Sequence, residues 1–477
     1  MTETAGMRAL LDLEDAAPDA LFESIPGIDV PLWPMARWPI SRALAETDIG
    51  TTVPTYRRAP VRQRVIRAAR RAIPNPWLAS RAPRAESLFL VSGWTRVPGP
   101  TGYANWLSDD FALALGASAV VVQDAFLDRV SRIDQRPANP RTYSYARAAE
   151  RITRATADRP LPPADRARLD AALRAAFAAL DHPVTEAGRE RAIADALGRA
   201  DRAPHAQREF GRLLDRVRPS RVYMQAAAYG TRAADIALAH DRGIDVAELQ
   251  HGWIGSSHAA YNSGAAMRRP ALARCLPDSL LGYGEYWGRG IRFPGRFLPI
   301  GKPTLDPRTL RATPWSERPR RVLFVTSNIE NELVDRALIA LRDALPVEWT
   351  VTLRPHPVER ATAREVHAAA LAEDRIELDL TPDADAALAT SRAVVGFSST
   401  MLFEALAYGC HVGVLDSALG AHYAQASVFP IRISADLGDV DAAAREFLTT
   451  PSAMEERLAD AVWAPGAVQN FRAFAAS

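Results

Sequence analysis

Short apolar runs alternate with longer amphipathic stretches along most of this chain. Turn residues bound several runs that are rich in β-branched and aromatic residues, among them ESLFLVSGW (86–94), ASAVVVQD (117–124) and SRVYMQAA (220–227). This pattern predicts buried strands. Between residues 140 and 216, Ala, Arg and Leu recur at helical spacing, which predicts a helical insert. Strands that alternate with helices favour a parallel sheet with right-handed crossovers.

A second alternation of the same kind begins after residue 319. The segment before it, KPTLDPRTLRATPWSERP (302–319), is rich in Pro, Thr and Arg, and we interpret it as a linker. The predicted fold class is therefore α/β, with two Rossmann-like domains that face each other across a cleft, over residues 86–305 and 306–465. Residues 466–477 would form a C-terminal tail or a helix that crosses back to the first domain.

Residues 1–85 lack this alternation, and their many prolines predict an irregular N-terminal extension. No acidic residue occurs between Ile49 and Ala85, whereas nine arginines do. Several of these arginines flank an apolar stripe that includes Val61 and Val65. This is the pattern of a basic amphipathic helix, which could lie on an anionic membrane surface. The alternative is a solvated helix that docks on its own protein.

Composition and charge narrow the class of protein. The 477 residues are 48% hydrophobic and 24% charged, and the formal net charge is +2, so no overall field favours nucleic acid. The polar, acidic amino terminus and the lack of an 18-residue apolar run predict neither a signal peptide nor a membrane span. Cys275 and Cys410 lie far apart without metal-ligand spacing, so we expect a cytoplasmic protein without a zinc or iron–sulfur site.

Polar side chains follow three strands that are expected in the second domain. They are hydroxyls, an amide and two cations: Thr326, Ser327, Asn328, Arg354, His356, Ser398, Ser399 and Thr400. Ligands of open α/β sheets bind at the carboxyl ends of the strands, and hydroxyls, helix starts and cations are suited to phosphate. We therefore expect a phosphate or pyrophosphate site here. The simpler interpretation is an ordinary N-cap and a Pro-stiffened turn with two surface cations.

Two charged residues accompany this expected phosphate site. Glu404 lies one turn into the helix that follows Thr400, which we expect to end at Gly409. Its carboxylate could reach a ribose or sugar hydroxyl, although a surface glutamate is the plainer alternative. Lys302 is the only lysine of the chain. It stands at the start of the linker, where it could face the cleft and contact the sugar.

The first domain has its most distinctive segment in ELQHGWIGSSHAAY (248–261). His251 follows a strand there and precedes a glycine, which lets the backbone approach a ligand. Such a histidine is suited to act as general base on an acceptor hydroxyl or to donate to a phosphate. Gln250 would contact the sugar, and His258 and Tyr261 the acceptor. The alternative is a histidine that is satisfied within the core.

The loop GWTRVPGPTGYANWLSDD (93–110) combines aromatic, basic and acidic residues after another strand. Aromatic rings beside carboxylates are common in sugar-binding loops, so we expect Trp94, Arg96 and Tyr103 to bind the acceptor. Asp109 in the same loop is a rival to His251 as general base.

The Gln-His-Gly strand end, the Arg-Pro-His-Pro segment and the Ser-Ser-Thr…Phe-Glu-Ala-Leu…Gly segment together resemble GT-B glycosyltransferases of bacterial surface-polysaccharide synthesis. These include Kdo- and sialic-acid-transferring enzymes of capsule and lipopolysaccharide, and polyol-phosphate transferases of teichoic acid. The resemblance is convincing over residues 220–420, loose over 86–130 and absent over 1–85. The segment CHVGVLDSALGAHYAQ departs from the Kdo enzymes.

This resemblance implies that the second domain binds a nucleotide sugar. The donor's phosphate would be held by Arg354, His356 and the hydroxyls of residues 398–400, with Glu404 at the ribose. GT-B enzymes generally need no divalent metal, because cationic side chains and a helix dipole stabilise the leaving phosphate. No metal or other cofactor is therefore expected.

We accordingly expect a cytoplasmic, membrane-peripheral glycosyltransferase that moves a sugar from a nucleotide donor to a growing or lipid-linked glycan. His251 would activate the acceptor hydroxyl from the first domain. One alternative is a polyol-phosphate transferase, in which His251 and His356 would both be central. A nucleotide-sugar epimerase of the same fold is another. A non-catalytic nucleotide-sugar-binding protein is a third.

Overall fold

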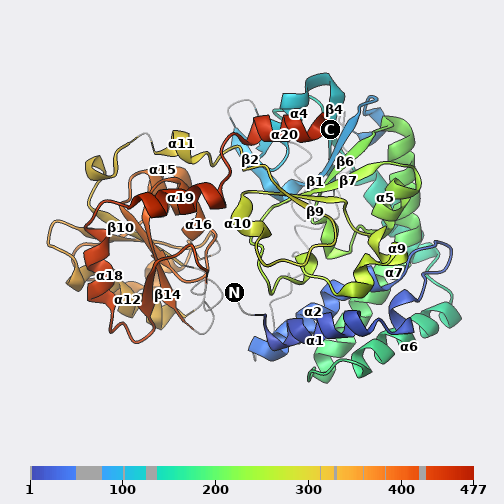
Figure 1. Ribbon diagram of the computed structural model, residues 1–477, viewed down its shortest axis with the longest axis horizontal. Helices are drawn as coiled ribbons and strands as arrows, with labels where there is room; N and C mark the ends of the chain where they lie inside the picture. Colours follow the sequence, from blue (N-terminus) through green and yellow to red (C-terminus); the bar gives the residue numbers. More distant parts are fainter. Residues whose placement is uncertain are drawn as a thin grey trace. The chain divides into compact units, whose positions relative to one another are not determined.

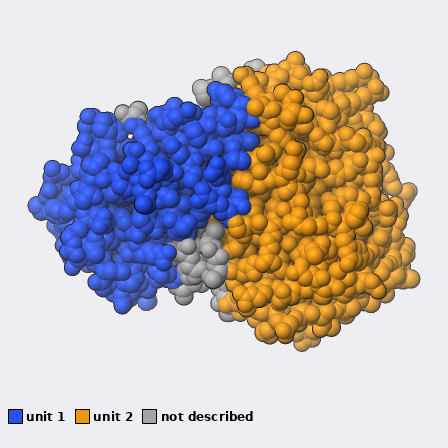
Figure 2. Space-filling model, viewed as in Figure 1, with its two compact units in different colours: residues 1, 283–289, 299–470 blue, residues 2–282, 290–298, 471–477 orange. Residues whose placement is uncertain are grey.

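The computed structural model describes residues 3–49, 78–99, 102–124, 137–311, 313–326, 330–357, 359–381, 383–417 and 426–477. The chain divides into two compact units, shown in different colours in Figure 2. Unit 1 comprises residues 283–289 and 299–470, and unit 2 comprises residues 2–282, 290–298 and 471–477. Each unit is therefore assembled from segments that are separated in the sequence.

Unit 2 is built on a seven-stranded sheet with the order β5-β4-β1-β6-β7-β8-β9; several of its strands are labelled in Figure 1. Its strands are β1 (Ser87–Ser92), β4 (Ala119–Asp124), β5 (Thr142–Ser144), β6 (Arg221–Gln225), β7 (Asp245–Leu249), β8 (Ser279–Gly282) and β9 (Arg296–Pro299). All neighbouring pairs from β5 to β8 are parallel. In chain order the first six strands follow the 3-2-1-4-5-6 order of dinucleotide-binding folds, so strand order reverses between β1 and β6.

Unit 1 repeats this topology in a six-stranded sheet with the order β12-β11-β10-β13-β14-β15. Its strands are β10 (Arg321–Val325), β11 (Thr350–Arg354), β12 (Ile376–Leu378), β13 (Ala393–Gly396), β14 (His411–Asp416) and β15 (Ile431–Ser434). Every pair is parallel, and the order again reverses once, between β10 and β13. The prediction of two Rossmann-like α/β domains is confirmed.

Helices cover both sheets. Those of unit 2 include α5 (Ala146–Asp158), α6 (Pro163–Ala178), α7 (Glu186–Val217) and α8 (Ala233–Asp241), so the expected helical insert is present. Leu90 of β1 packs in one core cluster with Ile152 of α5 and Phe210 of α7. Those of unit 1 include α12 (Asn331–Ala344), α16 (Met401–Ala407), α18 (Val440–Phe447) and α19 (Ala453–Val462). In the described part of the chain, no helix combines the length and apolar character that a membrane crossing needs.

Helix α20 (Ala467–Ala475) begins in unit 1 and ends in unit 2. Within unit 2 its Phe471 stacks on Phe111 of helix α4 (Asp109–Leu115), with 4.5 Å between the ring centroids. Phe471 also lies 5.9 Å from Phe89 of β1 and 5.0 Å from Tyr223 of β6. The C-terminal residues therefore cover the face of the sheet that carries Phe89.

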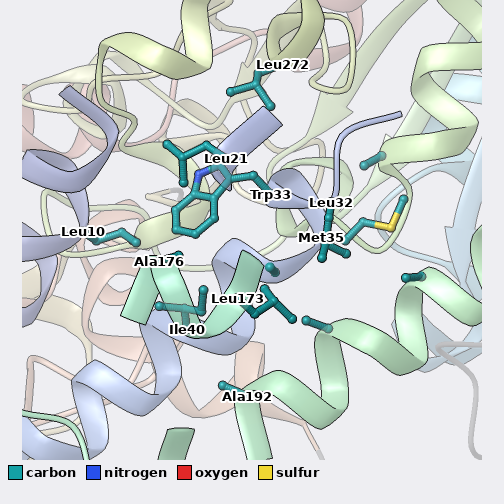
Figure 3. Packing of buried hydrophobic residues seen from close by; sticks show 14 of the residues in the cluster. Leu10, Leu21, Leu32, Trp33, Met35, Ile40, Leu173, Ala176, Ala192 and Leu272 are labelled. Carbon is teal, nitrogen blue, oxygen red and sulfur yellow. The ribbon is translucent and has the colours of Figure 1, made fainter. Parts of the chain in front are cut away.

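The N-terminal extension is not irregular where the structure describes it. Residues 5–16 form helix α1 and residues 33–49 form helix α2. Leu10 of α1, Trp33 and Ile40 of α2, and Leu173 of α6 belong to one buried cluster (Figure 3). Pro39 removes one hydrogen bond inside α2, but tertiary packing outweighs such a local preference. The predicted basic amphipathic helix, APVRQRVIRAARRAIP (59–74), lies outside the described residues.

Candidate functional site

Three predicted strand ends meet at one edge of the unit 1 sheet. Strand β10 lies between β11 and β13, and its Val325 pairs with Arg354 on one side and Gly396 on the other. Residues that follow these strands therefore emerge side by side, where the strand order reverses. Thr326, Arg354 and residues 398–400 therefore stand at the ends of three adjacent strands. Ser327 and Asn328 lie outside the described residues.

Arg354 is almost fully buried, with 3% of its surface exposed. Its guanidinium forms an ion pair with Asp379 and donates to Thr381 Oγ1 at 3.3 Å. Burial acts to raise the pKa of Asp379, but the hydrogen bonds from Thr381 and Arg354 prevail and hold that pKa below its usual value. Among the described residues, none offers an acceptor to the second terminal nitrogen, Nη2, which is buried. Arg354 is therefore part of the sheet edge, with one donor nitrogen that no described residue satisfies.

His356 lies on a loop whose backbone is hydrogen-bonded to the side chains of Thr326 and Glu359. Its side chain is exposed, while its backbone N–H donates to Glu359 Oε2 at 2.7 Å and to Thr326 Oγ1 at 3.1 Å. The Thr326 hydroxyl in turn donates to Glu359, which is buried. The Thr326 hydroxyl thus makes hydrogen bonds that fix the loop. The His356 side chain lies at the surface.

The hydroxyl segment after β13 leads directly into α16. The carbonyl of Thr400 accepts the backbone N–H groups of Phe403 and Glu404 at 3.0 and 3.1 Å, and Ser399 Oγ accepts the N–H of Met401 at 3.3 Å. Ser398 and Ser399 are half-buried, and Thr400 is exposed. The helix stops at Ala407, and Gly409 adopts φ +69°, as the predicted glycine stop requires.

Glu404 and Lys302 lie together in unit 1. Lys302 Nζ is 3.4 Å from Glu404 Oε1. The ammonium group also lies 5.9 Å from the ring centre of Tyr283 and 5.7 Å from that of Trp463. Burial raises the pKa of Tyr283, and the nearby Glu404 carboxylate adds to this. The only lysine of the chain is therefore held between a carboxylate and two aromatic rings, a geometry in which cation–π attraction contributes.

A buried carboxylate, that of Glu248, lies close to His251 in unit 2. Glu248 is fully buried on β7, where Oε2 accepts the N–H of Ala228 and Oε1 accepts the hydroxyl of Tyr261, both at 2.8 Å. Burial raises the pKa of Glu248 to about 7. His251 Nδ1 lies 4.0 Å from Glu248 Oε1. Burial lowers the pKa of His251 to about 4, so its ring is neutral near pH 7.

Aromatic rings surround the second histidine of this segment. His258 Nε2 lies 2.9 Å from the hydroxyl oxygen of Tyr229, and its ring stacks on Trp38 of α2 at 5.4 Å. The rings of Tyr261 and Trp253 lie 4.7 and 5.9 Å from it. Burial lowers the pKa of His258 to about 3. His258 and Tyr261 are thus close to the expected base, inside a cluster to which the N-terminal extension contributes a ring.

Gln250 and two side chains of the 93–110 loop make hydrogen bonds within the protein. Gln250 is buried, and its amide donates to the carbonyl of Gly252 at 2.9 Å. Arg96 Nε and the Tyr103 hydroxyl both donate to Gln123 Oε1 at 2.9 Å, and the guanidinium of Arg96 covers the Tyr103 ring at 4.6 Å. The side chain of Trp94 lies outside the described residues.

Asp109 begins helix α4 and is buried. Its Oδ2 accepts the backbone N–H of Asn105 at 2.8 Å. Burial raises the pKa of Asp109 to about 6, although this hydrogen bond and that from Ser108 act in the opposite direction. The carboxylate therefore closes the turn before α4, and its pKa also lies where a general base can operate.

Sequence reasoning missed several neighbours of these side chains. They are Trp38, Tyr229, Glu248, Glu359 and Asp379. Glu248 and Glu359 stand within three residues of His251 and His356, so local spacing was a usable signal. Trp38, Tyr229 and Asp379 come from remote segments, and no local pattern marks them. Among the described residues, no group of three or more His, Cys, Asp or Glu side chains is placed to hold a metal ion.

Chemically, the two edges offer different groups. The edge of unit 1 carries an exposed imidazole, a buried arginine and several hydroxyls, which suit an anionic ligand. The edge of unit 2 carries a neutral imidazole beside a carboxylate, which suits the acceptance of a proton. One edge can therefore bind a phosphate, and the other can activate a hydroxyl.

Comparisons with known proteins find similarity at the level of solved structures. No protein-family model matches this chain, and no curated protein does. Similar structures include the UDP-GlcNAc 2-epimerase from Neisseria meningitidis bound to UDP-GlcNAc (11% identity, 81% of this chain and 98% of that chain covered, TM-score 0.47). Also similar is a putative UDP-N-acetylglucosamine 2-epimerase from Listeria monocytogenes (14% identity, 82% of this chain and 95% of that chain covered, TM-score 0.47). Another is the glycotransferase of kitacinnamycin (16% identity, 82% of this chain and 96% of that chain covered, TM-score 0.42). Function therefore has to be inferred from the chemistry of the two strand edges.

Proposed function

We propose that this protein is a GT-B type glycosyltransferase that moves a sugar from a nucleotide donor to a hydroxyl of a cell-surface glycan or its lipid-linked precursor. One observation carries the proposal. Both sheets have the dinucleotide-binding strand order, and in unit 1 Arg354, His356 and the hydroxyls of residues 398–400 gather where that order reverses. Open α/β sheets bind their ligands at this place.

Unit 1 holds the donor in this proposal. The exposed His356 ring and Arg354 Nη2 bind the phosphate oxygens, and the hydroxyls after β13 complete the site. Glu404 contacts the ribose, with Lys302 beside it. These donors stabilise the charge that develops on the departing phosphate, so the reaction needs no divalent metal.

His251 of unit 2 activates the acceptor. A neutral imidazole takes the proton of the acceptor O–H, and the electron pair of that bond stays on oxygen. The oxygen attacks the anomeric carbon, and the bond to the donor phosphate breaks with its electron pair on the phosphate. The low pKa of His251 keeps the ring unprotonated near pH 7, which is the state that a base requires.

Calorimetric binding of CMP, CDP, UDP, GDP and dTDP, without metal, tests the donor site. We expect one nucleotide to bind to the wild type and to lose at least about tenfold in affinity in His356→Ala. Arg432→Ala on β15 is the matched control, since it removes another exposed cation from the same sheet. The proposal fails if no nucleotide binds, or if both variants lose affinity equally.

Product analysis separates this reaction from the alternatives. A transferase consumes the nucleotide sugar only when an acceptor is present, and His251→Ala abolishes turnover while sparing nucleotide binding. Binding of CDP followed by transfer of a polyol phosphate would replace the proposal with that reaction. An epimerised nucleotide sugar without acceptor would identify an epimerase. Binding that yields no product with any donor would identify a binding protein.

We also place the reaction at the cytoplasmic face of a membrane. The sequence between Ile49 and Ala85 carries nine arginines and no acidic residue, and basic segments are attracted to anionic lipid. The protein should sediment with phosphatidylserine vesicles and remain in the supernatant with phosphatidylcholine vesicles. Equal sedimentation with both would contradict this location.

A further inference from the structure

The carboxylate of Glu248 is the buried group closest to the proposed base that has no role yet. It is the penultimate residue of strand β7, and its Oε1 is 4.0 Å from His251 Nδ1. Its two oxygens accept the N–H of Ala228 and the hydroxyl of Tyr261. Both contacts hold the carboxylate in one orientation beside the imidazole.

A structural role alone does not explain a carboxylate at this position. Burial of an ionisable group is costly unless the group is paired. The two hydrogen bonds could be made equally well by a glutamine, whose oxygen would face Ala228 and whose amide would face the Tyr261 hydroxyl. What a glutamine cannot supply is a negative charge beside His251.

We propose that Glu248 is a positioning residue for His251, orienting the imidazole ring and balancing the positive charge that the ring gains when it takes the acceptor's proton. This inference rests on the proposed function of His251. It follows the general pattern in which a nucleophile's base is held by a third group. The transferred proton stays on the imidazole, and Glu248 carries no proton away.

The protonation states of the pair agree with this geometry. With the pKa of Glu248 at about 7 and that of His251 at about 4, the pair at pH 8 consists mainly of a carboxylate and a neutral ring. The other ionisable groups around it are Tyr229 from the turn after β6, Tyr261 and His258 from the following loop, and Arg37 from α2, which is paired with Glu14. The two tyrosines have raised pKa values and stay neutral.

An NMR titration of the His251 ring tests the coupling without any substrate. In wild type labelled with 13C-histidine, we expect the His251 signal to shift twice, once as Glu248 titrates and once as the ring itself does. In Glu248→Gln the first step should vanish, whereas the titration of the ring itself should stay near its wild-type pH, because Glu248 is already protonated there. Tyr261→Phe, which removes a donor from the carboxylate but keeps its charge, should move the first step to higher pH. Identical titrations in all three proteins would overturn the inference.

Kinetics then measure the consequence for the proposed reaction. We expect Glu248→Gln to slow sugar transfer by about 100-fold and to change its pH profile, with nucleotide affinity unaltered. Glu455→Gln is the matched control, because it removes the carboxylate of another imidazole pair, with His411 at 2.8 Å in unit 1. A slowed rate with an unchanged pH profile would overturn the positioning role. A coupled titration in a protein that transfers no sugar would instead sink the proposed function and leave the Glu248–His251 pair intact.

Discussion

At the scale of single residues, Glu248 makes stability depend on pH. Burial raises its pKa from 4.5 to about 7, so the folded protein keeps a proton that the unfolded chain releases. The stability contributed by this proton is fully present below pH 4.5 and is lost as pH rises through about 7. Glu248→Gln should therefore be more stable than wild type at pH 8, by up to about 3 kcal/mol, with the gain disappearing near pH 4.5. Urea unfolding at both pH values measures this, and a gain that does not change with pH would contradict it.

At the scale of elements, helix α2 secures the loop that carries Tyr261. Arg37 pairs with Glu14 of α1 and donates to the carbonyls of Ala259 and Asn262. Arg37→Met removes the positive charge that pairs with the buried Glu14, which keeps only the hydrogen bonds from Trp33 and Gly264, so it should cost about 3–5 kcal/mol in urea unfolding. Arg8→Met on α1 removes an exposed arginine and should stay within about 0.5 kcal/mol of wild type. Equal effects of the two substitutions would show that the buried Arg37–Glu14 ion pair does not stabilise the packing of α1 and α2.

At the scale of the whole molecule, unit 1 depends on a segment that the sequence places before the linker. Trp287 donates to the carbonyl of Val462 at 2.9 Å, and its ring lies 4.7 Å from that of Phe403. Trp287→Ala should destabilise unit 1 by about 3–5 kcal/mol. Hydrogen exchange should then accelerate in α16 and α19 but not in β1 and β4 of unit 2. Uniform acceleration along the chain would contradict the division into these units.

Much of the fold and part of the candidate site followed from local pattern. The strands were predictable because parallel strands that are buried on both faces read as continuous apolar runs. Arg354, His356 and the hydroxyls of residues 398–400 were predictable because polar residues directly after such runs must lie at the sheet edge. The stop at Gly409 followed from its tolerance of positive φ.

Other features had no local signal. Prolines made the N-terminal extension look irregular, yet the apolar faces of α1 and α2 find a core to pack against in unit 2. Trp38 reaches His258 from a segment some two hundred residues away in sequence, and Asp379 meets Arg354 across neighbouring strands. Thr326 looked like a phosphate ligand, but its hydroxyl is bonded to Glu359.

The sequence by itself determined the succession of strands and helices, the two sheets and the residues that stand at their carboxyl ends. Periodicity and turn residues record these properties because each depends on only a few neighbouring positions. Tertiary structure alone decided which segments share a unit, which carboxylate lies near His251 and which cation pairs with Glu404. Those pairings join residues that are remote in the chain, and they are selected by packing and desolvation, which no short window of sequence records.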